Sequence, residues 1–164
     1  MRRRVATLAL AALLLGETAQ AALPRRGVLE PGRSLGGLRL GAPESEVKAA
    51  WGSRFGVCRS CPEETWYFTY RPFRPEGAGV TFRRRRVAAL FTLWSPAGWR
   101  TAEGLRIGDH VARVTVVYGP LTRTECGTYY SLDLPRDGAL TSFYVVGDKV
   151  WGFGLSRAEV PPCR

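Results

Sequence analysis

Two segments of the chain carry apolar residues at the spacing of an amphipathic helix. The first lies between Pro43, a favoured first helical residue, and Gly52, a favoured C-terminal stop. The second lies between Asp109, a favoured N-cap, and the pair Gly119-Pro120. The sequence therefore predicts two short helices, with apolar faces made of Val47, Ala50 and Trp51 and of Val111, Val114 and Tyr118.

Runs rich in aromatic and β-branched residues follow each helix, as in an antiparallel meander. In chain order these runs are 65–70, 79–82 and 87–93 in the first half and 128–132, 141–146 and 150–155 in the second. Each half is thus predicted to be one helix followed by a meander. Two such modules in tandem predict an α+β fold with the helices on one face of a shared antiparallel sheet.

An internal repeat relates the two halves. The segment Gly37–Gly41 (GLRLG) recurs as Gly104–Gly108 (GLRIG), and at the same offset of 67 residues Gly52 matches Gly119. The repeat divides the chain into two modules with short connecting segments. We assign an N-terminal extension (22–33), module 1 (34–94), a linker (95–100) and module 2 (101–164).

The first 21 residues have the pattern of a secretory signal peptide. A positive start, Met1–Arg4, precedes an apolar run from Val5 to Gly16 and a small-x-small site that ends at Ala21. The apolar run is shorter than the roughly 20 residues that a membrane-spanning helix needs, and no later run is longer. We expect cleavage near Ala21 and a mature protein that is secreted or periplasmic, with no transmembrane segment.

Export would place the four cysteines in an oxidising compartment, where two disulfides are the simplest state. Four cysteines allow three pairings, and proximity in the sequence favours Cys58–Cys61 and Cys126–Cys163. A redox or zinc-binding role for Cys58-Arg59-Ser60-Cys61 is the alternative. The flanking residues lack the strand-then-helix context of a thioredoxin-like site, so structural bridges are predicted.

Composition argues against catalysis and predicts a basic surface. The chain has 24 Lys and Arg residues against 14 Asp and Glu residues, a net charge of +10, and one histidine, His110. It has no G-x-S-x-G motif, no phosphate-cradling glycine loop and no metal-ligand spacing. We therefore predict a protein that is not an enzyme, with no catalytic residue, metal site or cofactor.

Four adjacent arginines, Arg83, Arg84, Arg85 and Arg86, occupy the turn expected between the runs 79–82 and 87–93. Guanidinium groups bind phosphates and carboxylates through forked, charge-assisted hydrogen bonds. Anionic polymers, lipid headgroups or an acidic protein patch could therefore bind here. The alternative is a solvated turn that discourages edge-to-edge aggregation. Export argues against nucleic acid as the physiological ligand.

Aromatic residues on the predicted strands are the second group of candidates for partner binding. Side-chain alternation places Tyr67 and Tyr129 on the solvent face of the sheet, opposite the helices. The alternative is that the strand aromatics simply form the core. Trp94 and Trp99, near the linker, either cement the junction between the modules or contact a partner.

The order of these motifs resembles the SmpA/OmlA-type module. The resemblance lies in the Gly-hydrophobic-x-hydrophobic-Gly segment, the short helix ending in glycine, the Trp-Tyr strand and the hairpin, over residues 38–93 and again over 105–155. The module occurs in outer-membrane assembly lipoproteins of the BamE type and, in tandem, in β-lactamase inhibitor proteins. This chain departs from the lipoproteins because no cysteine follows the expected cleavage site.

The resemblance implies protein binding without chemistry, through an exposed concave sheet face. We therefore predict a secreted, non-enzymatic binding protein, such as an inhibitor or accessory factor of an exported protein, that binds its partner in the envelope or extracellular space. The alternative function is binding of an envelope or cell-surface polyanion through the arginine cluster. Polyanion binding would weaken steeply with added salt, whereas burial of aromatic side chains would not.

Overall fold

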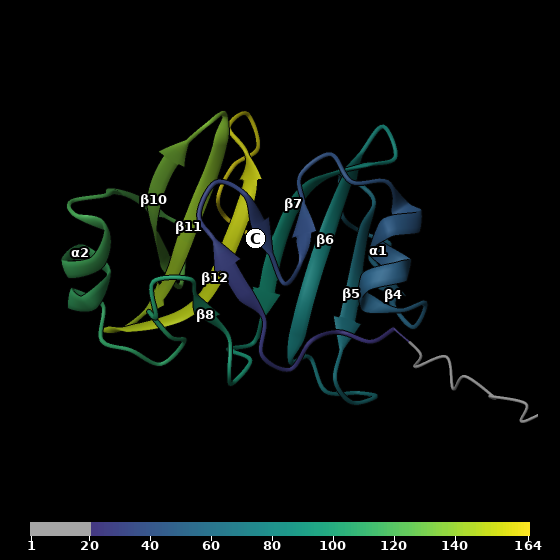
Figure 1. Ribbon diagram of the computed structural model, residues 1–164, viewed down its shortest axis with the longest axis horizontal. Coiled ribbons are helices and arrows are strands. Elements are labelled where there is room, and N and C mark those ends of the chain that lie inside the picture. Colours follow the sequence, from purple (N-terminus) through teal and green to yellow (C-terminus); the bar gives the residue numbers. More distant parts are fainter. Residues whose placement is uncertain (1–20) are drawn as a thin grey trace, which may run out of the picture.

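The computed structural model describes residues 21–164, and the largest element of the fold is an antiparallel sheet of eight strands (Figure 1). The strand order is β4-β5-β6-β7-β12-β11-β10-β9. The strands are β4 (Gly56–Val57), β5 (Thr65–Thr69), β6 (Gly77–Arg83), β7 (Arg86–Leu93), β9 (Thr122–Glu125), β10 (Tyr130–Arg136), β11 (Ala139–Val146) and β12 (Lys149–Arg157). Pairing of β7 with β12 joins the two halves of the sheet, and the expected signal peptide lies outside the described residues apart from Ala21.

A second, smaller sheet has four short strands in the order β3-β2-β1-β8. These strands are β1 (Val28–Glu30), β2 (Ser34–Leu35), β3 (Leu38–Arg39) and β8 (Arg100–Thr101), and β1 pairs with β8 in parallel. Two helices complete the described chain, α1 (Glu44–Trp51) and α2 (Ala112–Tyr118). The longer helix has eight residues, so neither helix within residues 21–164 could cross a bilayer.

The prediction of an α+β fold, with tandem helix-then-meander modules that share a single sheet, is wrong. The described chain is mostly β, and its strands lie in two sheets rather than one. Residues 28–30 and 100–101, which we assigned to the N-terminal extension and to the linker and start of module 2, pair as β1 and β8. Strands of two or three residues carry no measurable periodicity, and pairing between residues distant in sequence leaves no local signal. The division of the chain into two modules stays a prediction.

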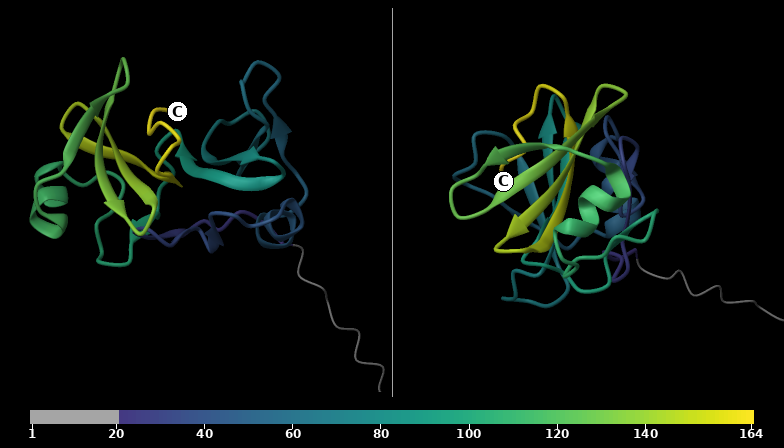
Figure 2. Two further views of the ribbon diagram at one scale, coloured as in Figure 1. Left: turned by 90° about the horizontal axis from the view of Figure 1, so that it is seen from above. Right: turned by 90° about the vertical axis from the view of Figure 1, so that its left-hand side faces the viewer.

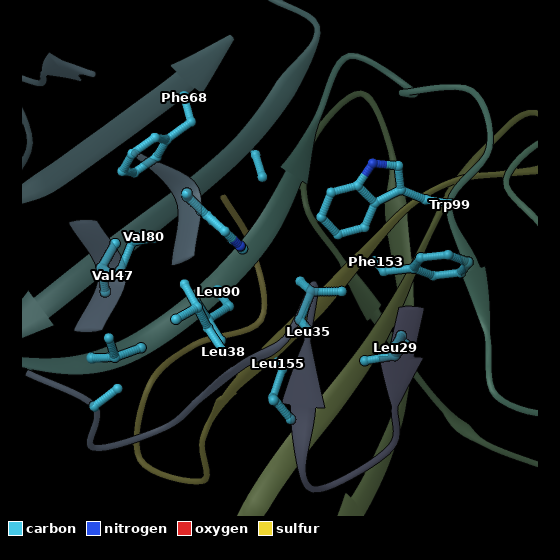
Figure 3. Close-up of a cluster of buried hydrophobic side chains, with 14 of the residues drawn as sticks. Leu29, Leu35, Leu38, Val47, Phe68, Val80, Leu90, Trp99, Phe153 and Leu155 are labelled. Carbon is cyan, nitrogen blue, oxygen red and sulfur yellow. The ribbon is translucent and has the colours of Figure 1, made fainter. Parts of the chain in front are cut away.

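The small sheet and the helices lie on one side of the arched large sheet, and the C-terminus lies on the other (Figure 2, left). Apolar side chains of the two sheets pack together between them (Figure 3). The small sheet contributes Leu29, Leu35 and Leu38, and the large sheet contributes Phe68, Val80, Leu90, Phe153 and Leu155. The small sheet therefore buries apolar surface that two helices of 8 and 7 residues are too short to cover.

The glycines that end the two repeated segments have equivalent backbone geometry. Gly41 and Gly108 adopt φ angles of 81° and 94°, in the region that favours glycine. Their amide groups donate to the carbonyl groups of Val87 and Val150 over 2.8 and 2.7 Å. Each glycine thus turns the chain at the start of a helical segment and ties that turn to a strand of the large sheet.

Candidate functional site

One row of paired residues defines the face of the large sheet that lies opposite the small sheet. Cross-strand partners follow one another across six strands, from Tyr67 on β5 to Asp133 on β10. In order the row is Tyr67, Gly79, Phe91, Gly154, Ser142 and Asp133. We call this surface the open face. It carries both tyrosines that the sequence selects for partner binding.

Two aromatic rings lie flat on the open face because glycines stand beneath them. A Cβ atom on Gly79 would come within 2.4 Å of the Phe91 ring, and one on Gly154 within 2.2 Å of the Tyr144 hydroxyl. Any side chain at these two positions would displace the rings. Phe91 and Tyr144 are consequently 4% and 3% exposed.

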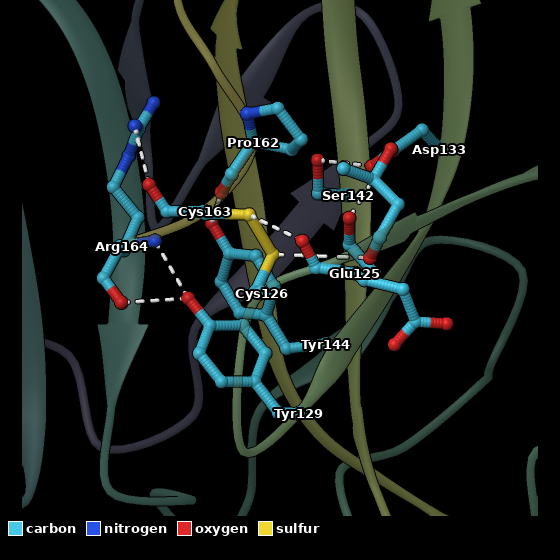
Figure 4. Close-up of a disulfide and its surroundings, with 11 residues drawn as sticks. Glu125, Cys126, Tyr129, Asp133, Ser142, Tyr144, Pro162, Cys163 and Arg164 are labelled. Carbon is cyan, nitrogen blue, oxygen red and sulfur yellow. Dashed lines mark hydrogen bonds between the residues drawn. A yellow bond between two sulfur atoms is a disulfide. The ribbon is translucent and has the colours of Figure 1, made fainter.

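The C-terminal residues 158–164 cover the middle of the open face (Figure 4). The Tyr144 hydroxyl donates to the Pro162 carbonyl over 3.0 Å, and Tyr129 exchanges two hydrogen bonds of 2.6 Å with the backbone of Arg164. The Arg164 guanidinium lies 5.8 Å from the centre of the Phe91 ring. The concave face that the family resemblance implies is therefore not fully exposed, because this chain's own C-terminal segment occupies part of it.

The four cysteines form two disulfides, Cys58–Cys61 and Cys126–Cys163, the pairs favoured by proximity in the sequence. Cys126–Cys163 holds the C-terminal segment against the sheet (Figure 4). Cys58–Cys61 lies at the β5 end of the open face, where the Cys61 sulfur is 3.5 Å from the Tyr67 hydroxyl. Cys58–Cys61 thus lies at one end of the row, and Cys126–Cys163 fixes the segment over its middle, which separates Tyr67 from Tyr129.

An accessible group of aromatic rings remains beside the C-terminal segment. Trp94 is 63% exposed, and its ring centroid lies 6.2 Å from that of Trp151, which lies 6.5 Å from that of Tyr129. A bulge in the pairing of β11 with β12 leaves Trp151 without a cross-strand partner. We call Trp94, Tyr129 and Trp151 the aromatic edge. Sequence reasoning missed Trp151 because regular alternation does not predict a bulge.

A buried carboxylate ends the row on β10. Asp133 is 4% exposed and accepts hydrogen bonds from the hydroxyl groups of Thr124, Ser131 and Ser142 over 2.7, 3.1 and 2.7 Å. These three donors satisfy the carboxylate without a cation. Asp133 therefore ties β9, β10 and β11 together.

The four arginines of the predicted turn do lie at the β6–β7 turn, but they do not act as one group. Arg83 pairs with Glu63, and Arg85 pairs with Glu44 over 3.0 Å. Arg84 is exposed, and Arg86 donates to the Gly41 carbonyl over 3.3 Å. These residues lie where β6 turns into β7, at one end of these two strands, so the structure does not bring them together with Tyr67 or Tyr129.

His110 is exposed at the start of α2, and its Nε2 atom lies 3.6 Å from the Asp148 carboxylate. Its Nδ1 atom accepts a hydrogen bond from the backbone of Ala112 over 3.1 Å. No three His, Cys, Asp or Glu side chains gather as metal ligands within residues 21–164.

Burial raises the pKa of the Tyr144 hydroxyl above its ordinary value of 10.0, because the anion would lose its solvation. Above pH 10 the unfolded chain loses this proton while the folded chain keeps it, so stability falls as the pH rises. We expect Tyr144 to lower the free energy of unfolding by about 1.4 kcal/mol for each pH unit above about pH 10. Urea unfolding from about pH 8 to about pH 11 would measure this slope.

Tyr144→Phe is the matched control for this slope. Burial also raises the pKa of Tyr118, which stays in both proteins, so only the difference between the two slopes belongs to Tyr144. The Phe variant should be less stable at neutral pH, because it loses the bond to Pro162, but less sensitive to alkali. Parallel slopes for the two proteins would contradict the prediction.

No protein-family model matches the chain, so its resemblance to the SmpA/OmlA-type module stays a prediction. No curated protein matches its sequence. Among solved structures, the chain is similar to an extracellular protein containing an SCP domain from Bacillus anthracis str. Ames, with 12% identity and a TM-score of 0.54. The match covers 73% of this chain and 44% of that one, so this chain spans under half of that protein's length.

A second similar structure is a DUF4309 family protein from Bacillus subtilis subsp. subtilis str. 168, with 10% identity and a TM-score of 0.47. That match covers 71% of this chain and 78% of the other. At 12% identity, the likeness to the Bacillus anthracis structure shows that the two chains share a fold over the matched part.

Proposed function

We propose that this chain is a secreted, non-enzymatic binding protein that holds an exported partner protein against its aromatic edge. The two disulfides support secretion, because such bonds persist in oxidising compartments. The structural similarity to an extracellular protein agrees with it. An inhibitor or accessory factor of an exported protein is the form of this function that the SmpA/OmlA resemblance implies.

The geometry of Trp94 is the observation that carries the proposal. Trp94 and the next residue, Ser95, both have left-handed backbone conformations, with φ angles of 53° and 51°. Such conformations cost on the order of 1 kcal/mol or more for residues with a side chain. The Trp94 ring is 63% exposed, so packing within the chain returns little of this cost. A strained backbone that presents an indole to solvent is typical of a recognition site.

The rest of the aromatic edge suits a protein partner. Trp and Tyr supply large, rigid contact areas and dominate the binding energy of many protein interfaces. Tyr129 is fixed by its two hydrogen bonds to Arg164, and Trp151 lies between Tyr129 and Trp94. Tyr129 and Trp151 are therefore held in place before binding, which lowers the entropy lost when a partner docks.

The oxidised mature protein is first used as bait to capture a partner from a mixture of exported and envelope proteins. Variants of the aromatic edge then test the proposal with that purified partner. For the purified pair, we expect Trp94→Ala to weaken binding by about 2–4 kcal/mol, the range of interface hot spots. Phe73→Ala is the matched control, because Phe73 is a fully exposed aromatic residue on the β5–β6 loop, outside the open face. Equal affinities of wild type and Trp94→Ala, measured by calorimetry at high salt, would rule out the aromatic edge as the binding surface.

A further inference from the structure

The β6–β7 turn, the β10–β11 turn and the end of β12 lie at the same end of the strands of the large sheet (Figure 1). Residues of these segments and of the small sheet line two adjoining hollows. The first has a volume of about 420 Å³, and its lining includes Arg33, Arg39 and Arg157. The second has a volume of about 380 Å³, and its lining includes Arg83, Arg84 and Arg86. Arg157 and Glu159 line both hollows, so the two are adjacent parts of one groove. We call it the arginine groove.

The arginine groove has an excess of positive charge. Among the described residues, Arg83 is the one arginine of the groove with a carboxylate within 4.0 Å, that of Glu63. Asp137 lines the first hollow and Glu159 lines both, and neither forms an ion pair with the groove arginines. Five of the arginines that line the groove, namely Arg33, Arg39, Arg84, Arg86 and Arg157, therefore have no carboxylate partner among residues 21–164.

The turn that presents Arg84 to the groove has an unfavourable backbone. Arg84 and Arg85 form the two-residue turn between β6 and β7, with φ angles of 50° and 60°. Turns with two left-handed residues strongly favour Asn-Gly. Arginine at both positions therefore costs stability that Asn-Gly would not, while it places Arg84 in the groove and Arg85 against Glu44.

We propose that the arginine groove binds a chain of phosphate groups, with phosphates in both hollows and Arg157 between them. Each phosphate within such a chain carries one negative charge and two free oxygens, and successive phosphates bring these charges close together. The chain can therefore pair with several guanidinium groups at once and outweigh Glu159 and Asp137. Two joined hollows fit repeated phosphates better than one isolated ion. Inorganic polyphosphate and a phosphodiester polymer share this chemistry.

This site is independent of the proposed function. Arg86 and Trp94 lie at or beyond opposite ends of β7, and Arg157 and Trp151 lie towards opposite ends of β12. A partner protein on the aromatic edge and a phosphate chain in the arginine groove would therefore contact different ends of the sheet. A negative result for one of these two sites therefore does not bear on the proposal for the other.

Calorimetry with tripolyphosphate at physiological salt tests the groove, and an oligomer of glycerol phosphate distinguishes a phosphodiester source. We expect Arg39→Gln with Arg157→Gln to weaken tripolyphosphate binding by about a hundredfold, since each charge-assisted contact contributes about tenfold. Arg71→Gln with Arg74→Gln is the matched control, because it removes the same charge from the β5–β6 loop outside the groove. The control should change the affinity less than about threefold.

A second variant separates binding from folding. Arg84→Asn with Arg85→Gly should raise the melting temperature, because it relieves the strained turn, and yet weaken tripolyphosphate binding by about tenfold. Two results would overturn the proposal in favour of a net-charge effect. One is an equal loss of tripolyphosphate affinity in the groove and control variants, and the other is polyglutamate binding as tight as that of tripolyphosphate. No measurable binding of tripolyphosphate to the wild type would also overturn it.

Discussion

Replacement of Trp99 by alanine is expected to lower the free energy of unfolding by about 3–5 kcal/mol, the cost of removing a large buried aromatic side chain. Trp99 is fully buried and meets Trp51 edge-on, with ring centroids 6.5 Å apart. Its indole N–H donates to the Tyr70 hydroxyl. The ring lies so close to Gly27 and Gly36 that a Cβ atom on either would come within 2.5 or 2.9 Å of it. Trp99 therefore packs the small sheet and its connections against the large one.

Urea unfolding of the wild type and the variant measures this loss, and Trp94→Ala is the control. Both changes remove an indole, but Trp94 is mostly exposed, so its replacement should lower the free energy of unfolding by less than about 1 kcal/mol. Trp99→Phe keeps an aromatic ring and should fall between the two, which gives a measurement even if Trp99→Ala does not fold. Similar losses for Trp99→Ala and Trp94→Ala would show that the small sheet is not held through Trp99.

Removal of the Cys126–Cys163 disulfide is expected to lower the free energy of unfolding by about 4 kcal/mol, from the closure entropy of its loop. The bonded residues are 37 positions apart, against 3 for Cys58–Cys61. The same relation gives about 2 kcal/mol for the shorter loop. The double variants Cys126→Ser/Cys163→Ser and Cys58→Ser/Cys61→Ser, unfolded without reductant, compare the two bridges directly.

Loss of the longer bridge should also uncover the open face. Without this disulfide, the segment 158–164 would be held only by its hydrogen bonds to Tyr129 and Tyr144 and by the packing of Val160 on Ala88 and Ala89. We expect faster amide exchange in this segment and stronger binding of a hydrophobic dye to the Phe91 region than in the Cys58→Ser/Cys61→Ser control. Unchanged exchange and dye binding would mean that the hydrogen bonds alone hold the segment in place.

Local signals in the sequence predicted the helices well but not the fold class. Pro43 precedes α1, and Gly52 and Gly119 end the two helices with φ angles of 89° and 78°. Helix α2 is shorter than predicted, because Asp109 accepts a hydrogen bond from the Arg106 amide instead of capping the helix. The small sheet was missed altogether, since its strands of two or three residues exist through pairing with distant segments.

For the candidate sites too, the sequence predicted single residues but not how the fold brings them together. Sequence alternation selected Tyr67 and Tyr129, and both do lie on or beside one face of the large sheet. It could not show that residues 158–164 cover the middle of that face, or that Trp151 joins Trp94 at a bulge. The run of four arginines was visible, but Arg83 and Arg85 are paired, and the groove gathers Arg33, Arg39 and Arg157 from elsewhere in the chain.

The sequence by itself determined the features that depend on neighbouring residues: the helix ends, most strands of the large sheet, the glycine turns and the basic turn between β6 and β7. Short-range sterics and hydrogen bonding control these features, so they leave a local pattern. Tertiary structure alone decided the second sheet, the covered open face, the aromatic edge and the arginine groove. Each of these brings together residues far apart in the chain, and such contacts form only when the whole chain buries its apolar surface.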